Sequence, residues 1–382
     1  MSTSRIPAVF YRGGTSKAVF FKSCDLPDST ALRNRIFCHV MGSPDPYGRQ
    51  LNGMGGGLSS LSKIVIVDPS SRDDADVDYT FVQIAVGEEV ADYSATCGNM
   101  SSAVGPFAVA ERMVDVSGDT ASVRVYNTNT DKHYTAIFPI HREQVVEAGD
   151  FEIPGVAGTG AKVTLNYESP AGATTGHVLP SGNALDTLEV EGVGSFDVSL
   201  VDSANPAVFV RAADLNLTAT ETPVDLDADS GMMKTLDLIR RHGAVAMGLS
   251  ESVESAPLAN PRVALVAAPQ DFTALDGRRY RADQYQVSVR MVSMGNLHRA
   301  VPLTGAMCIA TAANISGSIV HSCATQGDTV IVGNPSGLLP VEADVVPGPN
   351  GIEVVSATTY RTQRRLMEGF ILYPAEFDVA LA

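Results

Sequence analysis

The sequence predicts an α+β protein that is mostly β, with two similar domains that each wrap a sheet around a central helix. Three observations lead to this fold class. Short segments rich in Val, Ile, Phe and Tyr recur along the chain between clusters of Gly, Pro, Asp and Asn, which is typical of strands and turns. Each half contains one strongly apolar helical segment. The length of 382 residues exceeds what a single core usually serves, which favours two domains.

The predicted strands share an apolar, β-branched composition over four to eight residues. They cover residues 18–21, 63–67, 79–85, 122–126, 135–138, 163–167, 195–201, 207–210, 263–266, 286–292, 329–332 and 351–357.

Four helices are predicted from apolar residues at three- and four-residue spacing. Residues 98–112 and 304–315 form the two central helices, and the second is apolar nearly all round and followed by Gly317. Residues 28–41 and 231–247 have an amphipathic pattern and are expected at the periphery. The expected domain boundary lies in the segment LPSGNALD, so that residues 1–182 form the N-terminal domain and 183–382 the C-terminal domain.

Composition argues against several classes of protein. The formal net charge of −16 disfavours nucleic acid and anionic membranes as partners. Five scattered cysteines do not suggest a disulfide framework, and the seven histidines show no zinc spacing, so no metal is expected. The N-terminal residues carry no targeting pattern and no apolar run is long enough to span a bilayer, so a cytoplasmic location is expected.

Three loops are rich in glycine and hydroxyl residues: RGGTSK at 12–17, GMGGGLSSLSK at 53–63 and CGNMSS at 97–102. Glycine allows backbone N–H groups to converge on an anion, and Ser or Thr hydroxyls add donors without charge. An acidic protein with an anionic substrate would need local devices of this kind. The loop at 53–63 also resembles the phosphate loop of small-molecule kinases, but those loops lead into a helix, whereas KIVIV follows here.

Lys63 opens a β-branched segment directly after the second loop. Desolvation at the mouth of a cleft would favour the neutral amine, which can act as a base. The alternative is a lysine at the end of a strand that extends into water.

Cys97 comes just before a predicted helix, where the helix N-terminus would stabilise a thiolate. The alternative is a small core residue, the commoner role of a free cysteine. His298, in SMGNLHRA, is a candidate polar group ahead of the second central helix, although a structural role is the commoner one for a lone histidine. Arg361, Arg364 and Arg365 could form an anion clamp or simply a charged strand.

Together these motifs resemble the PrpF family, whose best-known members are 2-methylaconitate cis-trans isomerases. The segments that carry the resemblance span nearly the whole chain in the family's order. They are RGGTSK (12–17), GMGGGLSSLSK (53–63), CGNMSSAVGPFAVAER (97–112), residues 179–215, SMGNLHRA (293–300) and RTQRRLMEG (361–369).

The resemblance implies the diaminopimelate epimerase-like fold, in which two β-barrel-like domains each enclose a central helix and the active site lies between them. It also implies that Lys63 and Cys97 are the catalytic residues. Substrate binding is assigned to residues in and beside the matching segments: Thr15, Ser16, Gly55, Gly56, Gly98, Asn99, Ser101, Ser293, His298, Thr304, Ser336 and Gly337. Epimerases of this fold use a second cysteine before the second central helix, but here residues 300–304 contain none.

A Lys and Cys pair without a second thiol suits allylic proton transfer rather than racemisation. Lys63 would remove a proton next to a C=C bond conjugated to a carboxylate, and reprotonation would shift the double bond or change its geometry. Backbone N–H groups of the glycine loop and the helix N-termini would stabilise the intermediate, without any cofactor. The implied substrate is a small unsaturated di- or tricarboxylate such as 2-methylaconitate or aconitate.

Several alternatives remain at this level. One is a 4-oxalomesaconate-type tautomerase, since the resemblance extends to members with this chemistry. Many relatives have His-Pro-Ser-Gly where this chain has Asn334-Pro-Ser-Gly, a difference that bears on the choice of substrate. Two alternatives from other classes are an ATP-dependent small-molecule kinase and an inactive carboxylate-binding protein. The oligomeric state is open, with a homodimer among the states considered.

Overall fold

The computed structural model describes residues 2–94, 96–293, 295–325, 327, 329–348 and 351–379. The chain forms two compact units. Unit 1 comprises Met1–Asn166 and Tyr360–Ala382, and unit 2 comprises Tyr167–Thr359. The chain therefore leaves unit 1 some 16 residues before the expected boundary at 182, and its last segment returns to unit 1 instead of completing the second domain.

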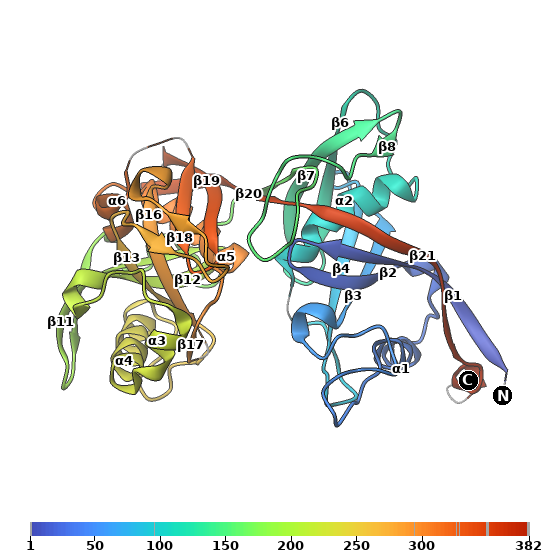
Figure 1. Cartoon of the computed structure of the whole chain (residues 1–382), viewed down its shortest axis with the longest axis horizontal. Coiled ribbons are helices and arrows are strands. Elements are labelled where there is room, and N and C mark those ends of the chain that lie inside the picture. Colours follow the sequence, from blue (N-terminus) through green and yellow to red (C-terminus); the bar gives the residue numbers. More distant parts are fainter. Residues whose placement is uncertain are drawn as a thin grey trace. The chain divides into compact units, whose positions relative to one another are not determined.

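Unit 1 is a sheet that surrounds one helix (Figure 1). Its strands are β1 (Thr3–Gly13), β2 (Ser16–Lys22), β3 (Lys63–Pro69), β4 (Val77–Ile84), β5 (Ala91–Asp92), β6 (Thr120–Asn127), β7 (Lys132–His141), β8 (Gln144–Val145), β9 (Val163–Glu168) and β21 (Gln363–Pro374). Its helices are α1 (Thr30–Met41), α2 (Gly98–Ala110) and the short α7 (Glu376–Val379).

Helix α2 is the centre of unit 1, as the sequence predicts. All its residues from Met100 to Val109 are buried. The Phe107 ring lies 5.2 Å from the ring of Phe20 and 6.4 Å from that of Tyr11, measured between centroids. Burying this aromatic cluster and the small residues around it holds the helix inside the sheet, and so fixes where its N-terminus emerges.

Unit 2 repeats this plan around α5 (Leu303–Ala313), whose residues other than Thr304 are all buried. Its strands are β10 (Asp186–Val190), β11 (Gly194–Ser203), β12 (Asn205–Arg211), β13 (Arg262–Ala267), β14 (Phe272–Thr273), β15 (Arg279–Tyr280), β16 (Val287–Ser293), β17 (Asn296–Leu297), β18 (Val330–Asn334), β19 (Gly337–Gly348) and β20 (Gly351–Arg361). The remaining helices are α3 (Pro223–Ala228), α4 (Ser230–Ala246) and α6 (Ile319–Cys323).

The two units share one strand topology. In unit 1, β2 pairs with β3 in parallel, β3 with β4 antiparallel, and β4 with β6 in parallel. In unit 2, β12 pairs with β13 in parallel, β13 with β16 antiparallel, and β16 with β18 in parallel. The central helix follows β5, a short antiparallel partner of β4, in one unit and β17, a short antiparallel partner of β16, in the other. This correspondence confirms the prediction of two similar mostly β domains.

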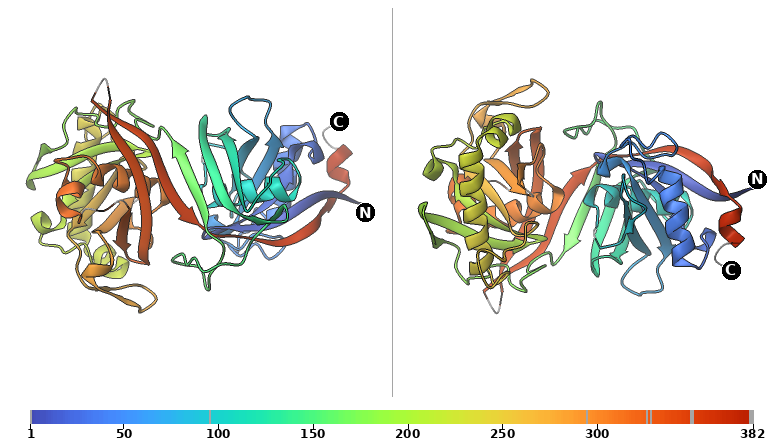
Figure 2. Two further views of the ribbon diagram at one scale, coloured as in Figure 1. Left: turned by 90° about the horizontal axis from the view of Figure 1, so that it is seen from above. Right: turned by 90° about the horizontal axis from the view of Figure 1, so that it is seen from below.

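The amphipathic helices lie outside the sheets. Figure 2 shows α1, in blue, along one face of unit 1 and α4, in yellow, along one face of unit 2. Each covers a separate apolar cluster on the side of the sheet away from the central helix, with Ile36 and Phe37 among the α1 contacts and Leu236 and Ile239 among those of α4. None of the helices in the described ranges is long and apolar enough to cross a membrane.

Strands β1 and β21 are long but absent from the predicted set. They pair antiparallel from Thr3–Pro374 to Gly13–Gln363. Both contain charged residues and exposed positions, so their composition does not predict strands. Hydrogen bonding between the two ends of the chain stabilises them instead.

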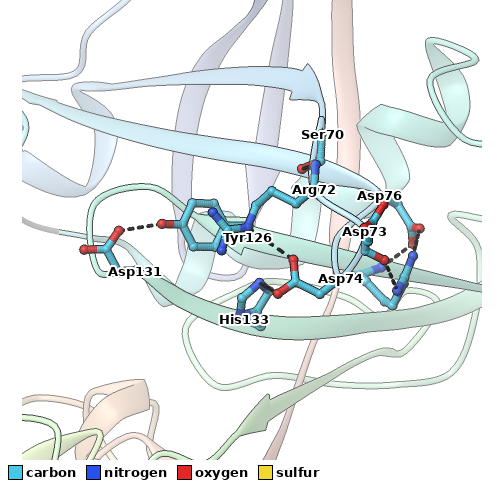
Figure 3. Close-up of polar contacts among 9 residues, drawn as sticks. Ser70, Arg72, Asp73, Asp74, Asp76, Tyr126, Asp131 and His133 are labelled. Carbon is cyan, nitrogen blue, oxygen red and sulfur yellow. Dashed lines mark hydrogen bonds and ion pairs between the residues drawn. The ribbon is translucent and has the colours of Figure 1, made fainter.

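A polar network ties the loop after β3 to the hairpin of β6 and β7 (Figure 3). Asp74 forms ion pairs with Arg72 at 3.2 Å and with His133 at 3.3 Å. The Arg72 guanidinium lies over the Tyr126 ring, 4.0 Å from its centroid. These charged groups are engaged with one another on an exposed surface, so the network stabilises a loop and does not form a site.

Candidate functional site

Lys63 is the first residue of β3, where it lies beside Ala18 of β2 and Gln83 of β4. Its side chain is buried, with 7% exposure. Nζ donates a hydrogen bond to Gln83 Oε1 at 2.7 Å and lies 4.9 Å from the centre of the Phe81 ring. The interpretation of Lys63 as a strand-end lysine reaching into water is therefore wrong.

Gln83 is itself held in one orientation. Its Nε2 donates to the carbonyl oxygens of Ser59 and Ser62 at 3.0 and 2.9 Å. These two residues belong to the end of the glycine-rich loop, which forms a short 3₁₀ turn at Ser59–Leu61. The loop therefore fixes the Gln83 amide, which in turn binds the Lys63 amine.

The glycine-rich loop does not have the donor pattern expected of an anion nest. The N–H groups of Met54 and Gly55 donate to the carbonyls of Val40 and Met41, and that of Gly57 donates to Gln50 Oε1. A Cβ atom at Gly55 would lie 2.3 Å from Gln50 Oε1, and one at Gly56 would lie 2.6 Å from the Leu61 side chain. At Gly55 the expectation of an anion-binding donor is thus contradicted, because close packing around Gln50 and the end of α1 takes up its N–H group.

Cys97 occupies the N-cap of α2 in an extended conformation, and its half-buried side chain makes no capping hydrogen bond. Its carbonyl accepts from the N–H and the Oγ of Ser101 and from the hydroxyl of Tyr79. The first-turn N–H groups beyond it, including that of Gly98, have no carbonyl partner within the helix. A thiol and a set of backbone donors therefore share one helix end.

Two other cysteines, Cys38 and Cys308, are buried, whereas Cys97 is half-buried. Burial raises the pKa of Cys38 to about 11 and that of Cys308 to about 12. Cys308 also lies fully inside the apolar cluster around α5. These two thiols behave as small core residues, which is the alternative considered for Cys97.

Asn99 connects the turn between β1 and β2 to the end of the chain. Its Nδ2 donates to Thr15 Oγ1 at 3.1 Å, and its Oδ1 accepts from Arg361 Nε at 3.1 Å. Gly14 has a φ of +50°, and a Cβ there would lie 2.3 Å from Asn99 Oδ1, so only glycine allows the turn to approach so closely. Thr15 is exposed and Ser16 is buried beside it.

Strand β4 supports both predicted catalytic residues. Alternate residues of a strand face the same side, which places Tyr79, Phe81 and Gln83 together. Tyr79 binds the Cys97 carbonyl, while Phe81 and Gln83 contact the Lys63 amine. One face of a single strand therefore positions the base candidate and the start of α2.

In unit 2 a comparable group forms at the start of α5. Arg262, the first residue of β13, donates from Nη1 to Thr304 Oγ1 at 3.0 Å. Burial, with a smaller contribution from Arg262, lowers the pKa of His298 to about 4. The buried atoms Arg262 Nε and His298 Nε2 have no hydrogen-bond partner among the described residues. The group therefore presents a neutral imidazole and a guanidinium with unused donor capacity.

Ser336 and Gly337 lie at the tight turn between β18 and β19. Asn334 is buried, and its side chain donates to the Gly337 carbonyl at 2.9 Å and accepts from the Ser336 N–H at 3.1 Å. Ser336 Oγ donates to the Arg299 carbonyl at 2.6 Å. The Asn334 amide thus closes its own turn. The side chain of Ser293 lies outside the described residues.

The three arginines near the end of the chain do not form one anion clamp. Arg361 is buried against Asn99, whereas Arg365 forms ion pairs with Glu111 at 2.7 Å and Glu368 at 2.8 Å. Arg364 is exposed. Of the three, Arg361 is the one bonded to the first turn of α2, while Arg365 pairs with Glu111 at the other end of this helix.

Sequence reasoning missed Gln83 and Arg262. Gln83 carries no motif, because its importance arises from its register opposite Lys63. Arg262 had a signal: like Lys63, it is a basic residue that opens an apolar strand, here RVALVA.

Comparison with known proteins gives consistent results. A family model described as PrpF protein matches residues 3–374. A 2-methyl-aconitate isomerase of Shewanella oneidensis is 38% identical over 97% of both chains. A 3-methylitaconate isomerase of Eubacterium barkeri is 39% identical over 96% of this chain and 97% of that one, and a 4-oxalomesaconate tautomerase of Pseudomonas putida is 36% identical over 97% of both.

Among solved structures, a methylitaconate-delta-isomerase superposes with a TM-score of 0.91 at 36% identity, covering 99% of this chain and 97% of that one.

Proposed function

The chain belongs to the PrpF family, and from this premise we propose that it isomerises a small unsaturated di- or tricarboxylate by proton transfer at an allylic carbon. The observation that carries the proposal is the buried Lys63 amine, which donates a hydrogen bond to a neutral amide and lies near the face of an aromatic ring. Lys63 forms no ion pair with any residue that the structure describes. Such an amine can exchange a proton with a substrate without first breaking a salt bridge.

In the proposed reaction, Lys63 Nζ takes a proton from a carbon next to the conjugated double bond. The C–H bond breaks, an N–H bond forms, and the electron pair spreads into the double bond and its carboxylate. The first-turn N–H groups of α2 stabilise the resulting anion. With the glycine loop internally bonded at Gly55, the helix N-terminus is the stronger of the two proposed sources of donors.

Cys97 is proposed as the acid that returns a proton. Delivery to the far carbon shifts the double bond, and delivery to the original carbon after rotation changes its geometry. Asn99 forms hydrogen bonds with Thr15 and Arg361, and these are proposed to hold the first turn of α2 in position to bind the substrate.

Unit 2 is proposed to contribute carboxylate recognition. Arg262 keeps a fixed positive charge, and a guanidinium binds carboxylate in a directional manner. Thr304 adds a hydroxyl and His298 a neutral ring. The names of the relatives favour 2-methylaconitate or methylitaconate as the substrate over 4-oxalomesaconate, because those names occur at the higher identities.

The test is proton NMR of aconitate, 2-methylaconitate, methylitaconate and oxalomesaconate with the enzyme in deuterated buffer. We expect one of them to exchange its allylic protons and isomerise. Lys63→Met should abolish both, because it removes the amine that takes the allylic proton, whereas the exposed Lys132→Met should have no effect. Normal exchange in Lys63→Met would refute the role of Lys63.

The same experiment separates the alternatives. Tight aconitate binding without exchange or isomerisation would indicate a carboxylate-binding protein. Binding of magnesium nucleotide would instead support a kinase.

A further inference from the structure

The Gln83 side-chain amide that accepts a hydrogen bond from the Lys63 amine is fixed in one orientation. Gln83 Nε2 faces the carbonyl oxygens of Ser59 and Ser62, which only accept hydrogen bonds. Rotating the amide by 180° would set its oxygen against two other oxygens. The amide oxygen is therefore the atom that faces Lys63 Nζ, at 2.7 Å.

This direction matters for a base. A neutral amine has two N–H bonds and one lone pair. If the amide presented its NH₂ group, it would donate to the lone pair and occupy the site that must take the substrate proton. Because it presents oxygen, it binds an N–H bond of Lys63 and leaves the lone pair directed elsewhere.

Both contacts of the amine also suit the ammonium that forms when Lys63 takes the proton. A carbonyl oxygen accepts a stronger hydrogen bond from an ammonium than from an amine, and the face of an aromatic ring attracts a cation. Positive charge develops on Nζ while the proton leaves the substrate. Gln83 and Phe81 therefore stabilise the charge that appears in the transition state.

We propose that Gln83 is the positioning residue of the base: locked by the Ser59 and Ser62 carbonyls, it orients the lone pair of Lys63 and stabilises the ammonium that proton abstraction produces. The inference rests on the proposed role of Lys63.

The charged side chains on the strands next to Lys63 contact groups other than Lys63 and Gln83. On β2, Lys17 follows the turn and its amine lies 5.5 Å from the centre of the Phe10 ring. On β5, Asp92 is paired with Gln83 in the sheet, but its carboxylate accepts from the Ser94 N–H at 2.8 Å. Cys97 is the remaining titratable group assigned to the reaction.

The test measures the rate of solvent deuterium exchange into substrate against pH for the wild type, Gln83→Glu and Gln83→Met. In Gln83→Glu a carboxylate adjoins the amine and holds it protonated, so the pH of half-maximal rate should rise by about one unit or more. Gln83→Met removes the acceptor without adding charge, and should lower the maximal rate about tenfold or more. Gln144→Glu, at an exposed position of the same unit, is the matched control for the added charge.

A merely structural role for Gln83 predicts a different result. Both variants would then lose rate equally at every pH, with the pH of half-maximal rate unchanged, and this would overturn the proposal. Thermal melts of each variant show whether the fold is retained. If Lys63→Met keeps normal exchange, the proposed function fails; if Lys63→Met is inactive but Gln83→Glu leaves the pH profile in place, only the role of Gln83 fails.

Discussion

The two units place different chemistry at corresponding positions of one fold. Strand β3 follows the outer helix of unit 1, and β13 follows the outer helix of unit 2. The first residue is Lys63 in β3 and Arg262 in β13. The central helix has Cys97 as its N-cap in unit 1 and Pro302 in unit 2. Unit 1 thus carries an amine and a thiol at these positions, and unit 2 carries a guanidinium and a residue without any polar side chain.

The difference bears on the proposed division of roles between the two units. Although burial lowers the pKa of Arg262, it does so from a value so high that the side chain stays protonated. Arg262 can therefore bind an anion but cannot act as a base. Proline at the second N-cap removes the second thiol. Under the proposed function, proton transfer belongs to unit 1 and carboxylate recognition to unit 2, and each assignment can be tested separately.

The largest effect is expected for Cys97→Ala. Loss of a general acid should lower kcat for isomerisation by about 10²- to 10⁴-fold. Because the thiol makes no capping hydrogen bond, the melting temperature should change little. Turnover is followed by NMR, with the exposed Cys24→Ala as control. Full turnover in Cys97→Ala would show that the thiol is not needed for proton transfer. The difference between Cys97 and Pro302 would then have no catalytic consequence.

Arg262→Lys tests the other side of the comparison. Lysine retains the charge but lacks the planar fork, so KM should rise about 10- to 100-fold while kcat changes less. Steady-state kinetics measure this split. Arg211→Lys, in the neighbouring strand and partly exposed, should leave both constants close to wild type. An unchanged KM with a collapsed kcat would mean that Arg262 does more than bind.

The smallest effect concerns His298 and the pH dependence of stability. Its pKa is about 4 in the folded protein and near 6.5 in the unfolded chain, so the unfolded state binds the extra proton first as pH falls. Stability should therefore decrease from about pH 6.5 towards pH 4, by roughly 1 to 2 kcal/mol between pH 6.5 and 5.

Denaturant unfolding at pH 7, 6 and 5 measures this loss of stability. His298→Asn cannot take up the proton and should show a shallower dependence over the same range. An equal slope in both proteins would show that other groups cause it.

Local pattern was sufficient to identify much of the molecule. The apolar runs of α2 and α5 predict buried helices, and the motif CGNMSS around Cys97 identifies that residue as a candidate before any fold is known. The amphipathic helices were also predicted within one or two residues of α1 and α4. These features depend on neighbours three or four positions away, so they are visible in the sequence.

Tertiary structure decided the rest, because it depends on pairing between distant residues. Gln83 reaches Lys63 only through the register of β3 and β4, and Arg361 reaches Asn99 from 262 positions away because β20 leads back into unit 1. The glycine loop was expected to bind an anion, yet at Gly55 its N–H group is taken by the end of α1. The sequence by itself determined which side chains could transfer protons; the strand pairing determined which neutral and charged groups surround them.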